Sequence, residues 1–319
     1  MKKILITGTL GFIFSNFVRK AAYEKAPYTY CAVDKATNSS TINSNIYINK
    51  SLTSNYIADI CDSHIMDTIF KFEGPDIVVH GAAESCVDDS LKDPNVFIQS
   101  NVLGTQVMIN VARKYNVKKF IYISTDEVYG ALKSEDEPSW TEQSPMNPRN
   151  PYSASKASGE LLVKAAHESF GLPYIITRSC NNYGPRQTPN KFIPRIIKSI
   201  LNKEKIPVYG QGLQIRDWLH VFDNCSAILK ILEKGELNNT YNISANQEFS
   251  NIEVVNQVCN AMGEGHSLVT HVEDRKGHDF RYSIDSSKLK TLGWSPSVKF
   301  KDGVIETCDW YKQNSYFLR

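Results

Sequence analysis

The stretch ILITGTLGFIFSNFV, residues 4–18, decides the fold class of this chain. A short apolar run leads into Gly8 and Gly11, and a segment with helical spacing follows. In this order of strand, glycine turn and helix, backbone N–H groups at the helix N-terminus can hold a pyrophosphate. Phe14 stands where a third glycine would complete the pattern. Two glycines alone are a weak signal, so other parts of the chain must decide whether the turn binds anything.

Four more apolar or β-branched runs follow, at residues 28–34, 76–83, 118–125 and 173–179, with helical spacing between them. Nearly all-apolar strands that alternate with helices predict a parallel sheet covered on both faces. We therefore expect an α/β fold, with a doubly wound Rossmann sheet in residues 1–182 and a smaller α/β substrate domain in 183–319. Some C-terminal segments are expected to return to the first domain, and the ligand cleft is expected between the two.

Composition excludes several classes of protein. The 319 residues carry a net charge of +2 and no concentrated basic run, so nucleic acid is not an expected partner. No apolar stretch approaches the roughly 20 residues that a membrane span needs. The seven cysteines lack paired spacing, so we expect neither a disulfide framework nor a metal site. Reduced cysteines and a cytoplasmic location are the expectation.

The end of the second predicted strand carries Asp34. A carboxylate at this place can accept hydrogen bonds from the ribose hydroxyls of a dinucleotide. It favours NAD, because it would repel the 2′-phosphate of NADP. Lys35 and the hydroxyl-rich segment that follows leave NADP open.

A Tyr-x-x-x-Lys pattern occurs twice, as Tyr115 with Lys119 and as Tyr152 with Lys156. On a helix this spacing puts the phenol and the ammonium on one face, where the cation would lower the pKa of the tyrosine and make it a base. The first pair precedes a strand and is attributed to chance. The second follows Pro151, which can start a helix, and is the catalytic candidate.

The segment ISTDEVYG, residues 123–130, comes at the end of another predicted strand. In an open parallel sheet, ligands bind at this edge. Asp126 and Glu127 follow Thr125 there, and two carboxyls in different environments can serve as acid and base. A lone Asp-Glu pair is more often a helix cap, but its position after a buried strand favours a functional role.

Taken together, these stretches resemble the extended short-chain dehydrogenase/reductases, and within them the nucleotide-sugar 4,6-dehydratases of the dTDP-glucose type. The matching segments are GxxGFI, AVDK, ADICD, AAES, SNVLGT, STDEVYG, PYSASKAS, NNYGP, IRDWLHV and GHDFRYSID. They occur in the family's order and cover nearly the whole chain. The combination is specific, although GxxG and YxxxK individually are not.

The resemblance implies a mechanism. Tyr152 would take the proton of the C4 hydroxyl while the nicotinamide takes hydride from C4, with Thr125 bonding that oxygen and Lys156 holding the tyrosinate and ribose. Glu127 would remove the C5 proton and Asp126 would protonate the departing C6 hydroxyl. Hydride would then return to C6, giving a 4-keto-6-deoxy sugar.

The resemblance also assigns binding residues. Those implied for the cofactor are Gly8, Gly11, Phe12, Ile13, Asp34, Lys35, Asp59, Ile60, Ala82, Ala83, Asn101, Ser124, Tyr152 and Lys156. Those implied for the nucleotide sugar are Ser85, Asn181, Asn190, Lys191, Arg216, Asn251, Arg275, His278 and Tyr282. A homodimer through two helices, at about 95–115 and 152–170, is implied as well.

The chain departs from the family pattern at several places. Phe14 replaces a glycine, and Gly81 stands where a bulky aliphatic residue is usual, so we expect the phenyl ring to fill the space at Gly81. Cys86, Asn190 and Lys276 replace a histidine, a glutamate and a proline that the family tends to carry. These three changes lie near the sugar and leave a different hexose open, such as an N-acetylated glucose.

Several alternatives stay open at this point. The nucleobase can be uracil or thymine, and the dehydration can be accompanied by inversion at C5. A nucleotide-sugar 4-epimerase would share the tyrosine and lysine but has no need of the two acids. A sensor that binds dinucleotide or nucleotide sugar without turnover is the non-enzymatic alternative.

Overall fold

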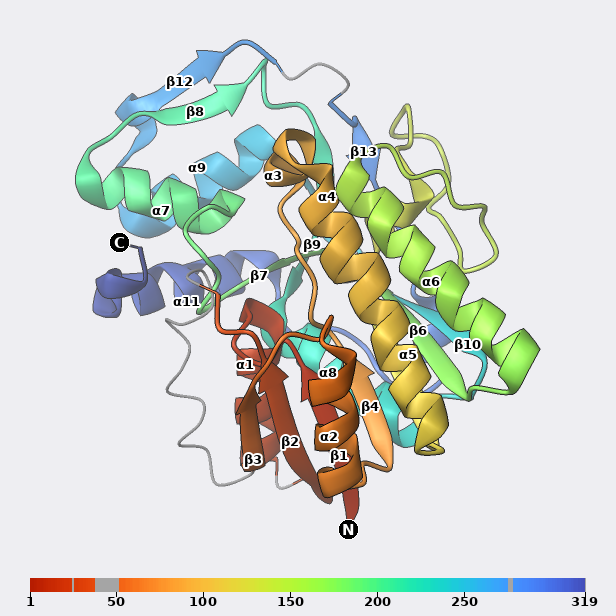
Figure 1. Cartoon of the computed structure of the whole chain (residues 1–319). Coiled ribbons are helices and arrows are strands. Elements are labelled where there is room, and N and C mark those ends of the chain that lie inside the picture. Colours follow the sequence, from red (N-terminus) through yellow and green to blue (C-terminus); the bar gives the residue numbers. More distant parts are fainter. Residues whose placement is uncertain (25, 38–51, 275–277, 319) are drawn as a thin grey trace.

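The computed structural model describes residues 1–24, 26–37, 52–274 and 278–318, and its main element is a seven-stranded parallel sheet (Figure 1). In spatial order the strands are β10 (Asn239–Ile243), β6 (Tyr174–Ser179), β5 (Lys119–Thr125), β4 (Ile77–His80), β1 (Lys2–Thr7), β2 (Tyr28–Asp34) and β3 (Leu52–Ile57). The order reverses between β1 and β4, as in doubly wound nucleotide-binding sheets. The expected fold class is confirmed, although β3 was not anticipated.

Helices cover both faces of this sheet. Helices α1 (Phe12–Tyr23) and α8 (Val221–Lys234) pack on one face. Helices α2 (Ser63–Glu73), α5 (Gly104–Lys114) and α6 (Pro151–Phe170) pack on the other. Along β1, Ile4 and Ile6 join the first core while Leu5 joins the second. Because successive side chains point to opposite faces, a strand buried on both faces is apolar throughout.

A smaller part of the molecule lies beyond the carboxyl edge of the large sheet (Figure 1). Its strand β9 (Ile215–His220) pairs with β7 (Asn181–Tyr183), β11 (Glu248–Ser250) and β13 (Arg281–Tyr282). Strand β8 (Ile206–Tyr209) pairs with β12 (Val269–Val272). Helices α7 (Phe192–Asn202), α9 (Asn251–Met262) and α11 (Phe300–Gln313) share a separate apolar core.

Two C-terminal elements belong to the layers of the large sheet. Strand β10 pairs in parallel with β6, and α8 packs against α1. The boundary between residues 182 and 183 therefore does not divide the molecule into two continuous halves. No helix in the described ranges is long and apolar enough to cross a membrane.

The remaining elements are short. They are α3 (Val87–Lys92), α4 (Pro94–Phe97), the π-helix η2 (Ile98–Leu103), η3 (Asp126–Tyr129), η4 (His266–Leu268), α10 (Ser287–Lys290) and η5 (Ser315–Leu318). Tyr115 caps the end of α5 and Lys119 begins β5, so this pair does not share a helix face.

Candidate active site

The glycine turn joins β1 to α1 at the carboxyl edge of the sheet. Gly8 has a φ of +80°, and a Cβ added there would lie 2.8 Å from the backbone nitrogen of Ala82. Gly11 is the N-cap of α1, and the N–H of Leu10 donates to the carboxylate of Asp34 at 2.9 Å. The turn is therefore a cradle of bare backbone at a helix N-terminus, which fits the pyrophosphate of a dinucleotide.

A cleft runs along this edge of the sheet, and all but two of the residues expected at the cofactor line it. They are Gly8, Gly11, Phe12, Ile13, Asp34, Lys35, Ile60, Ala82, Ala83, Ser124, Tyr152 and Lys156. The exceptions are Asp59, whose exposed side chain accepts from the N–H of Cys61, and Asn101. Thr37, Gln187 and Thr188 line the cleft without having been anticipated.

Lys35 lies at the rim of the cleft and pairs with Glu84, at 3.1 Å between Nζ and Oε1. Burial alone would lower the pKa of Lys35, but the hydrogen bond and charge of Glu84 outweigh it and raise that pKa. The ammonium thus has a carboxylate partner within the protein. This arrangement, together with the carboxylate of Asp34, favours NAD over NADP.

Phe14 occupies the space beside Gly81. The ring is 3% exposed, and a Cβ built on Gly81 would overlap its edge. Phe14 also packs edge-on against Phe17, at 5.6 Å between ring centroids. The expectation that the Phe14 ring fills the space beside Gly81 is confirmed. The glycine turn accommodates a phenylalanine where the third glycine would stand.

Asn101 lies behind the cleft, on the π-helix η2, and is 1% exposed. Its amide donates to the carbonyl of Glu84 at 2.9 Å and to Oγ of Ser155 at 2.8 Å. Its Oδ1 accepts from the N–H of Glu84 at 2.8 Å. Asn101 thus ties η2 to α6 and to the loop after β4.

A buried histidine that we had not singled out extends this network. His80 Nδ1 lies 2.8 Å from Oγ1 of Thr7, and its Nε2 lies 3.0 Å from Oγ1 of Thr105. Because the hydroxyl of Thr105 donates to the carbonyl of Asn101, Nε2 must carry the ring proton and Nδ1 must accept from Thr7. Burial and the charge of Lys156 lower the pKa of His80 to about 3, so it is neutral. A histidine inside an apolar strand was the available signal.

The two acids follow β5 directly. Asp126 and Glu127 begin η3, where Oγ1 of Thr125 accepts from the N–H of Glu127 at 3.3 Å. Asn150, the N-cap of α6, donates to Oε2 of Glu127 at 3.1 Å. Tyr152 lies in the first turn of α6, hydrogen-bonds with Thr125 and interacts with both carboxyls. The structure therefore brings the phenol and the two acids together beside the cleft.

The two carboxyls differ in their environments. Burial, with the charges of Glu127 and Asp217, raises the pKa of Asp126 to about 8. Its Oδ2 is buried and has no hydrogen-bond partner. Burial also raises the pKa of Glu127, but the hydrogen bond from Asn150 and the charge of Arg216 oppose that rise. Asn150 and Arg216 thus favour the ionised form of Glu127, whereas Asp126 holds its proton up to about pH 8, and two carboxyls that differ in this way can serve as base and acid.

The side chain of Lys156 differs from expectation. Burial lowers its pKa to about 7, and its Nζ lies 4.2 Å from the centroid of the Tyr122 ring. Burial and the charge of Glu127 raise the pKa of Tyr152, with Thr125 opposing them. The predicted lowering of the tyrosine pKa by the ammonium is therefore not observed in this arrangement, because Nζ lies over Tyr122.

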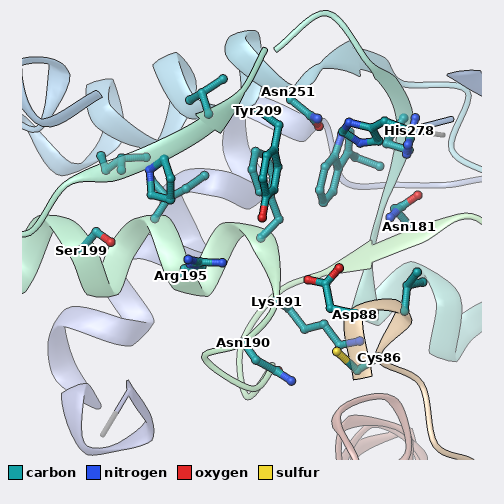
Figure 2. Close-up of a pocket in the computed structure, with 18 residues that line it drawn as sticks. Cys86, Asp88, Asn181, Asn190, Lys191, Arg195, Ser199, Tyr209, Asn251 and His278 are labelled. Carbon is teal, nitrogen blue, oxygen red and sulfur yellow. The ribbon is translucent and has the colours of Figure 1, made fainter. Parts of the chain in front are cut away.

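A second cavity adjoins the first (Figure 2). Among the residues expected at the nucleotide sugar, it is lined by Asn181, Asn190, Lys191, Arg216, Asn251 and His278. Ser85 lines the cofactor cleft instead, and its carbonyl accepts from Nζ of Lys191 at 2.7 Å. Arg275, with the departure at Lys276, lies outside the described residues.

Arg216 lies on β9 and points toward the second cavity. It stacks on Tyr282, at 4.2 Å to the ring centroid, which places Tyr282 beside the cavity. The guanidinium donates to the carbonyls of Ile215, Asp279 and Phe280. Burial lowers the pKa of Arg216. A buried cation of this kind suits a diphosphate.

Other residues of the second cavity were not anticipated. Tyr209 packs edge-on against His278, and Arg195 follows Lys191 by one turn of α7 (Figure 2). An aromatic residue at the end of a short strand and a basic i, i+4 pair were the available signals. Cys86, Asn190 and Lys191 line both cavities and mark where they join. No cluster suited to a metal ion occurs among the residues that the structure covers.

Comparison with known proteins identifies the family. The family model described as GDP-mannose 4,6 dehydratase matches residues 5–307. The chain belongs to the GDP-mannose 4,6-dehydratase family. Relatives in this family include the dTDP-glucose 4,6-dehydratase of Streptomyces niveus, which is 41% identical over 98% of this chain and 93% of its own length. That of Salmonella typhimurium is 41% identical over 99% of this chain and 94% of its own.

Solved structures of this family and of neighbouring ones share the fold. The dTDP-glucose 4,6-dehydratase of Streptomyces venezuelae, solved with NAD and a second ligand, has a TM-score of 0.93 and 38% identity, covering 99% of this chain and 98% of its own. A UDP-glucose 4-epimerase of Thermotoga maritima has a TM-score of 0.90 and 28% identity, covering 98% and 99%. The expected reaction class, a nucleotide-sugar 4,6-dehydratase that uses NAD, is confirmed for this GDP-mannose 4,6-dehydratase family member.

Proposed function

We propose that this enzyme converts dTDP-glucose to the 4-keto-6-deoxy sugar with loss of one water. The observation that carries the proposal is the convergence of Thr125, Asp126, Glu127 and Tyr152 at the point where the cofactor cleft meets a second cavity. The curated relatives at about 40% identity over nearly the full chain, named dTDP-glucose 4,6-dehydratases, support this choice of nucleotide sugar.

The residues of the cleft fit NAD, which supplies an acceptor and later a donor of hydride when bound. The backbone at Gly8 and Gly11 would hold the pyrophosphate and Asp34 the ribose. Tyr152 removes the proton of the C4 hydroxyl, and Thr125 donates a hydrogen bond to the same oxygen. Lys156, whose pKa of about 7 lets it gain or lose a proton at neutral pH, would support the tyrosinate after its Nζ turns from Tyr122 toward the phenol.

The acid and the base then carry out the elimination. A ketone at C4 acidifies the proton at C5, and Glu127 removes it. Asp126 gives its proton to the C6 hydroxyl, and the C6–O bond breaks. Water departs, and a double bond remains between C5 and C6. Hydride adds to C6 and a proton adds to C5, which restores the cofactor without net oxidation.

The second cavity offers groups for the rest of the substrate. Arg216 and Lys191 are cations that suit the diphosphate. Asn251, His278 and Tyr209 line the same cavity on the side away from Cys86 and Asn190 (Figure 2), where a nucleoside would bind. Cys86 and Asn190 lie at the junction of the two cavities, beside the predicted hexose site, and are the positions that would set the choice of sugar.

The test is to incubate the purified protein and NAD with dTDP-glucose, UDP-glucose and UDP-N-acetylglucosamine. Mass spectrometry should show loss of water from dTDP-glucose in preference to the other two, and NMR of the product should show whether C5 is inverted. An unchanged mass with a changed C4 configuration would indicate an epimerase. Binding without any product would indicate a sensor.

A matched pair of variants tests the roles. Glu127→Gln should oxidise C4 and accumulate reduced cofactor in a single turnover, seen by its near-ultraviolet absorbance, without releasing water. Tyr152→Phe should form no reduced cofactor at all. Reduced cofactor at equal rates in both variants would contradict the assignment of Tyr152 to the oxidation step.

We also propose a homodimer through α5 and α6, which lie side by side (Figure 1). Large apolar side chains are exposed on these helices and on the segment before them, including Ile98 and Leu103 at 50% and Leu161 at 55%. Leu103→Glu with Leu161→Glu should give a monomer in sedimentation velocity. Phe72→Glu, at an apolar residue on α2 that is 80% exposed, is the control and should leave the dimer intact.

A cytoplasmic location completes the proposal. All seven cysteines are free, which suits a reducing compartment. Fractionation of the source cells with an antibody to the protein should find it in the cytoplasmic fraction; recovery from a secreted or envelope fraction would contradict this.

A further inference from the structure

Three residues form a row just beyond the carboxyl edge of the large sheet. The last residues of β5, β6 and β10 pair with one another across the sheet. The residues that follow them are Asp126, Cys180 and Ser244. Neighbouring strands lie about 4.8 Å apart, so Asp126 and Ser244 are separated by roughly two such spacings, with Cys180 between them.

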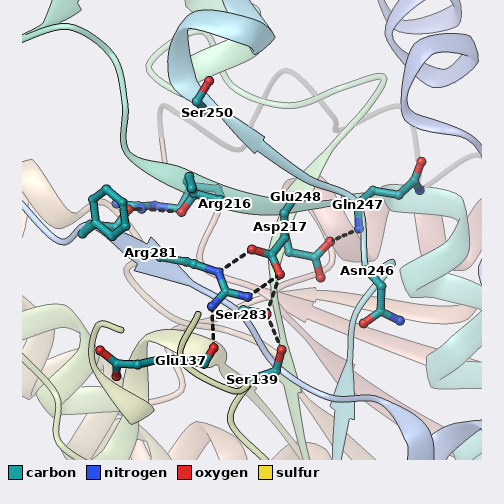
Figure 3. A network of polar contacts seen from close by, with 12 residues as sticks. Glu137, Ser139, Arg216, Asp217, Asn246, Gln247, Glu248, Ser250, Arg281 and Ser283 are labelled. Carbon is teal, nitrogen blue, oxygen red and sulfur yellow. Dashed lines mark hydrogen bonds and ion pairs between the residues drawn. The ribbon is translucent and has the colours of Figure 1, made fainter. Parts of the chain in front are cut away.

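Asp217, on β9, packs against the far end of this row. Its Oδ2 accepts from Oγ of Ser244 at 2.5 Å. Its Oδ1 accepts from the N–H of Gln247 at 2.9 Å (Figure 3). The thiol of Cys180 also hydrogen-bonds with this carboxylate. Asp217 is 1% exposed and lines neither cavity. Burial raises the pKa of Asp217, and these three donors oppose that rise and favour the ionised form, which places a negative charge near Asp126.

We propose that Asp217 is a positioning residue for the acid step, whose charge keeps the proton on Asp126 until the C6 hydroxyl leaves. This inference rests on the role given to Asp126 in the proposed function. The space between the two groups is closed to solvent, because Asp126 is 3% exposed and Cys180 4%. Burial holds the pKa of the Cys180 thiol well above its usual range, so it stays neutral and does not screen the interaction.

The other charges around Asp126 do not replace this effect. Glu127, its neighbour on η3, acts in the same direction but must itself be ionised as the base. Arg216 acts in the opposite direction and faces the substrate cavity. Glu248 faces Asp217 but is paired with Arg281, at 2.6 and 2.9 Å (Figure 3). Asp217 is thus a charge that can be removed without changing any expected contact with substrate.

The decisive variant is Asp217→Asn, which keeps the shape of the side chain. Its Oδ1 can still accept from Gln247, and its amide can donate to Ser244. Two charges about 10 Å apart at an effective dielectric near 20 interact by roughly one pH unit. The high-pH limb of kcat, which reports loss of the proton from Asp126, should move to lower pH by about one unit. The low-pH limb should move less, because the leading charges that act on Glu127 are those of Arg216, Lys191 and Asp279.

A second readout does not depend on turnover. The carbonyl stretch of protonated Asp126, isolated by infrared difference against Asp126→Asn with NAD bound, should titrate about one unit lower in Asp217→Asn. Ser244→Ala keeps the charge of Asp217, so it should change neither the pH of the high-pH limb of kcat nor the pH at which the carbonyl band titrates. If Asp217→Asn does not fold, Asp217→Ser removes the same charge and carries the same expectation.

The outcomes separate the two proposals. A uniform fall in kcat with an unmoved limb and an unmoved band would reduce Asp217 to a structural role and overturn the inference. A moved band in a protein that removes no water from any of the three nucleotide sugars would sustain the interaction between Asp217 and Asp126 but reject the proposed function.

Discussion

The exchange of volume between Phe14 and Gly81 makes a quantitative prediction. Phe14→Gly removes a buried ring, at a cost of about 3–5 kcal/mol in the free energy of unfolding, plus about 1 kcal/mol for a glycine in a helix. Gly81→Leu forces a side chain into the ring of Phe14 and costs about 1–3 kcal/mol or more. In the double variant the leucine fills the space that the ring has left. We expect the double variant to lose about 2–3 kcal/mol less free energy of unfolding than the sum of the losses in the two single variants.

The assay is equilibrium unfolding in urea of the four proteins without cofactor, followed by tryptophan fluorescence and circular dichroism. The control cycle pairs Gly81→Leu with Phe70→Ala, a fully buried phenylalanine of α2 in the core on the opposite face of the sheet. That cycle should be additive to within about 0.5 kcal/mol. Additivity of the Phe14 cycle to the same degree would show that the two positions do not share space energetically, and the reasoning would fail.

Three further predictions address the cofactor, pH and a buried ion pair. Gly8→Ala should weaken NAD binding at least tenfold by calorimetry, because the added Cβ would meet the backbone of Ala82. The control is Gly74→Ala, which also has a positive φ but open space around it and should bind NAD normally. The folded protein keeps a proton on Asp126 up to about pH 8, whereas the unfolded chain releases it near the ordinary pKa, so stability is lost as pH rises over this range. Asp126→Asn should therefore gain about 4 kcal/mol relative to the parent between pH 5 and pH 8 in thermal melts, and a constant difference would contradict this. Glu160→Gln breaks the buried pair with Arg178, at 2.6 Å, and should cost about 3–5 kcal/mol in urea unfolding, while Glu233→Gln, in an exposed pair, should change stability by less than about 1 kcal/mol.

Much of the large sheet could be predicted because its signals are local. Strands β1, β2, β4 and β5 are short apolar or β-branched runs, and a glycine turn follows β1 and an acidic pair follows β5 directly in sequence. Strand β3, with the sequence LTSNYI, lacks such a run and was not predicted. The pairing of β4 with β1, which brings Gly81 to Phe14, followed from the same topology. Gly8, Gly11 and Asp34 lie at the ends of these strands and were found together with them, whereas most of the other cofactor residues were implied by the family resemblance.

The parts that were not predicted depend on contacts between distant segments. The tautomer of His80 is set by Thr7 and Thr105, and neither is adjacent to it in sequence. The spacing of Tyr152 and Lys156 gives a shared helix face but not the direction of Nζ, which Tyr122 on β5 determines. The difference between the two acids likewise depends on burial and on a charge from β9.

The return of the C-terminal half of the chain to the large sheet limits how chimaeras of these enzymes can be built. A cassette that carries the substrate-binding half of one relative also carries β10 and α8, which complete the sheet and one helical layer of the other half. Cutting after residue 182 would leave β6 as a bare edge, open to pairing with other chains. Exchange of specificity is therefore better attempted through the loops at the cavity junction than through whole halves.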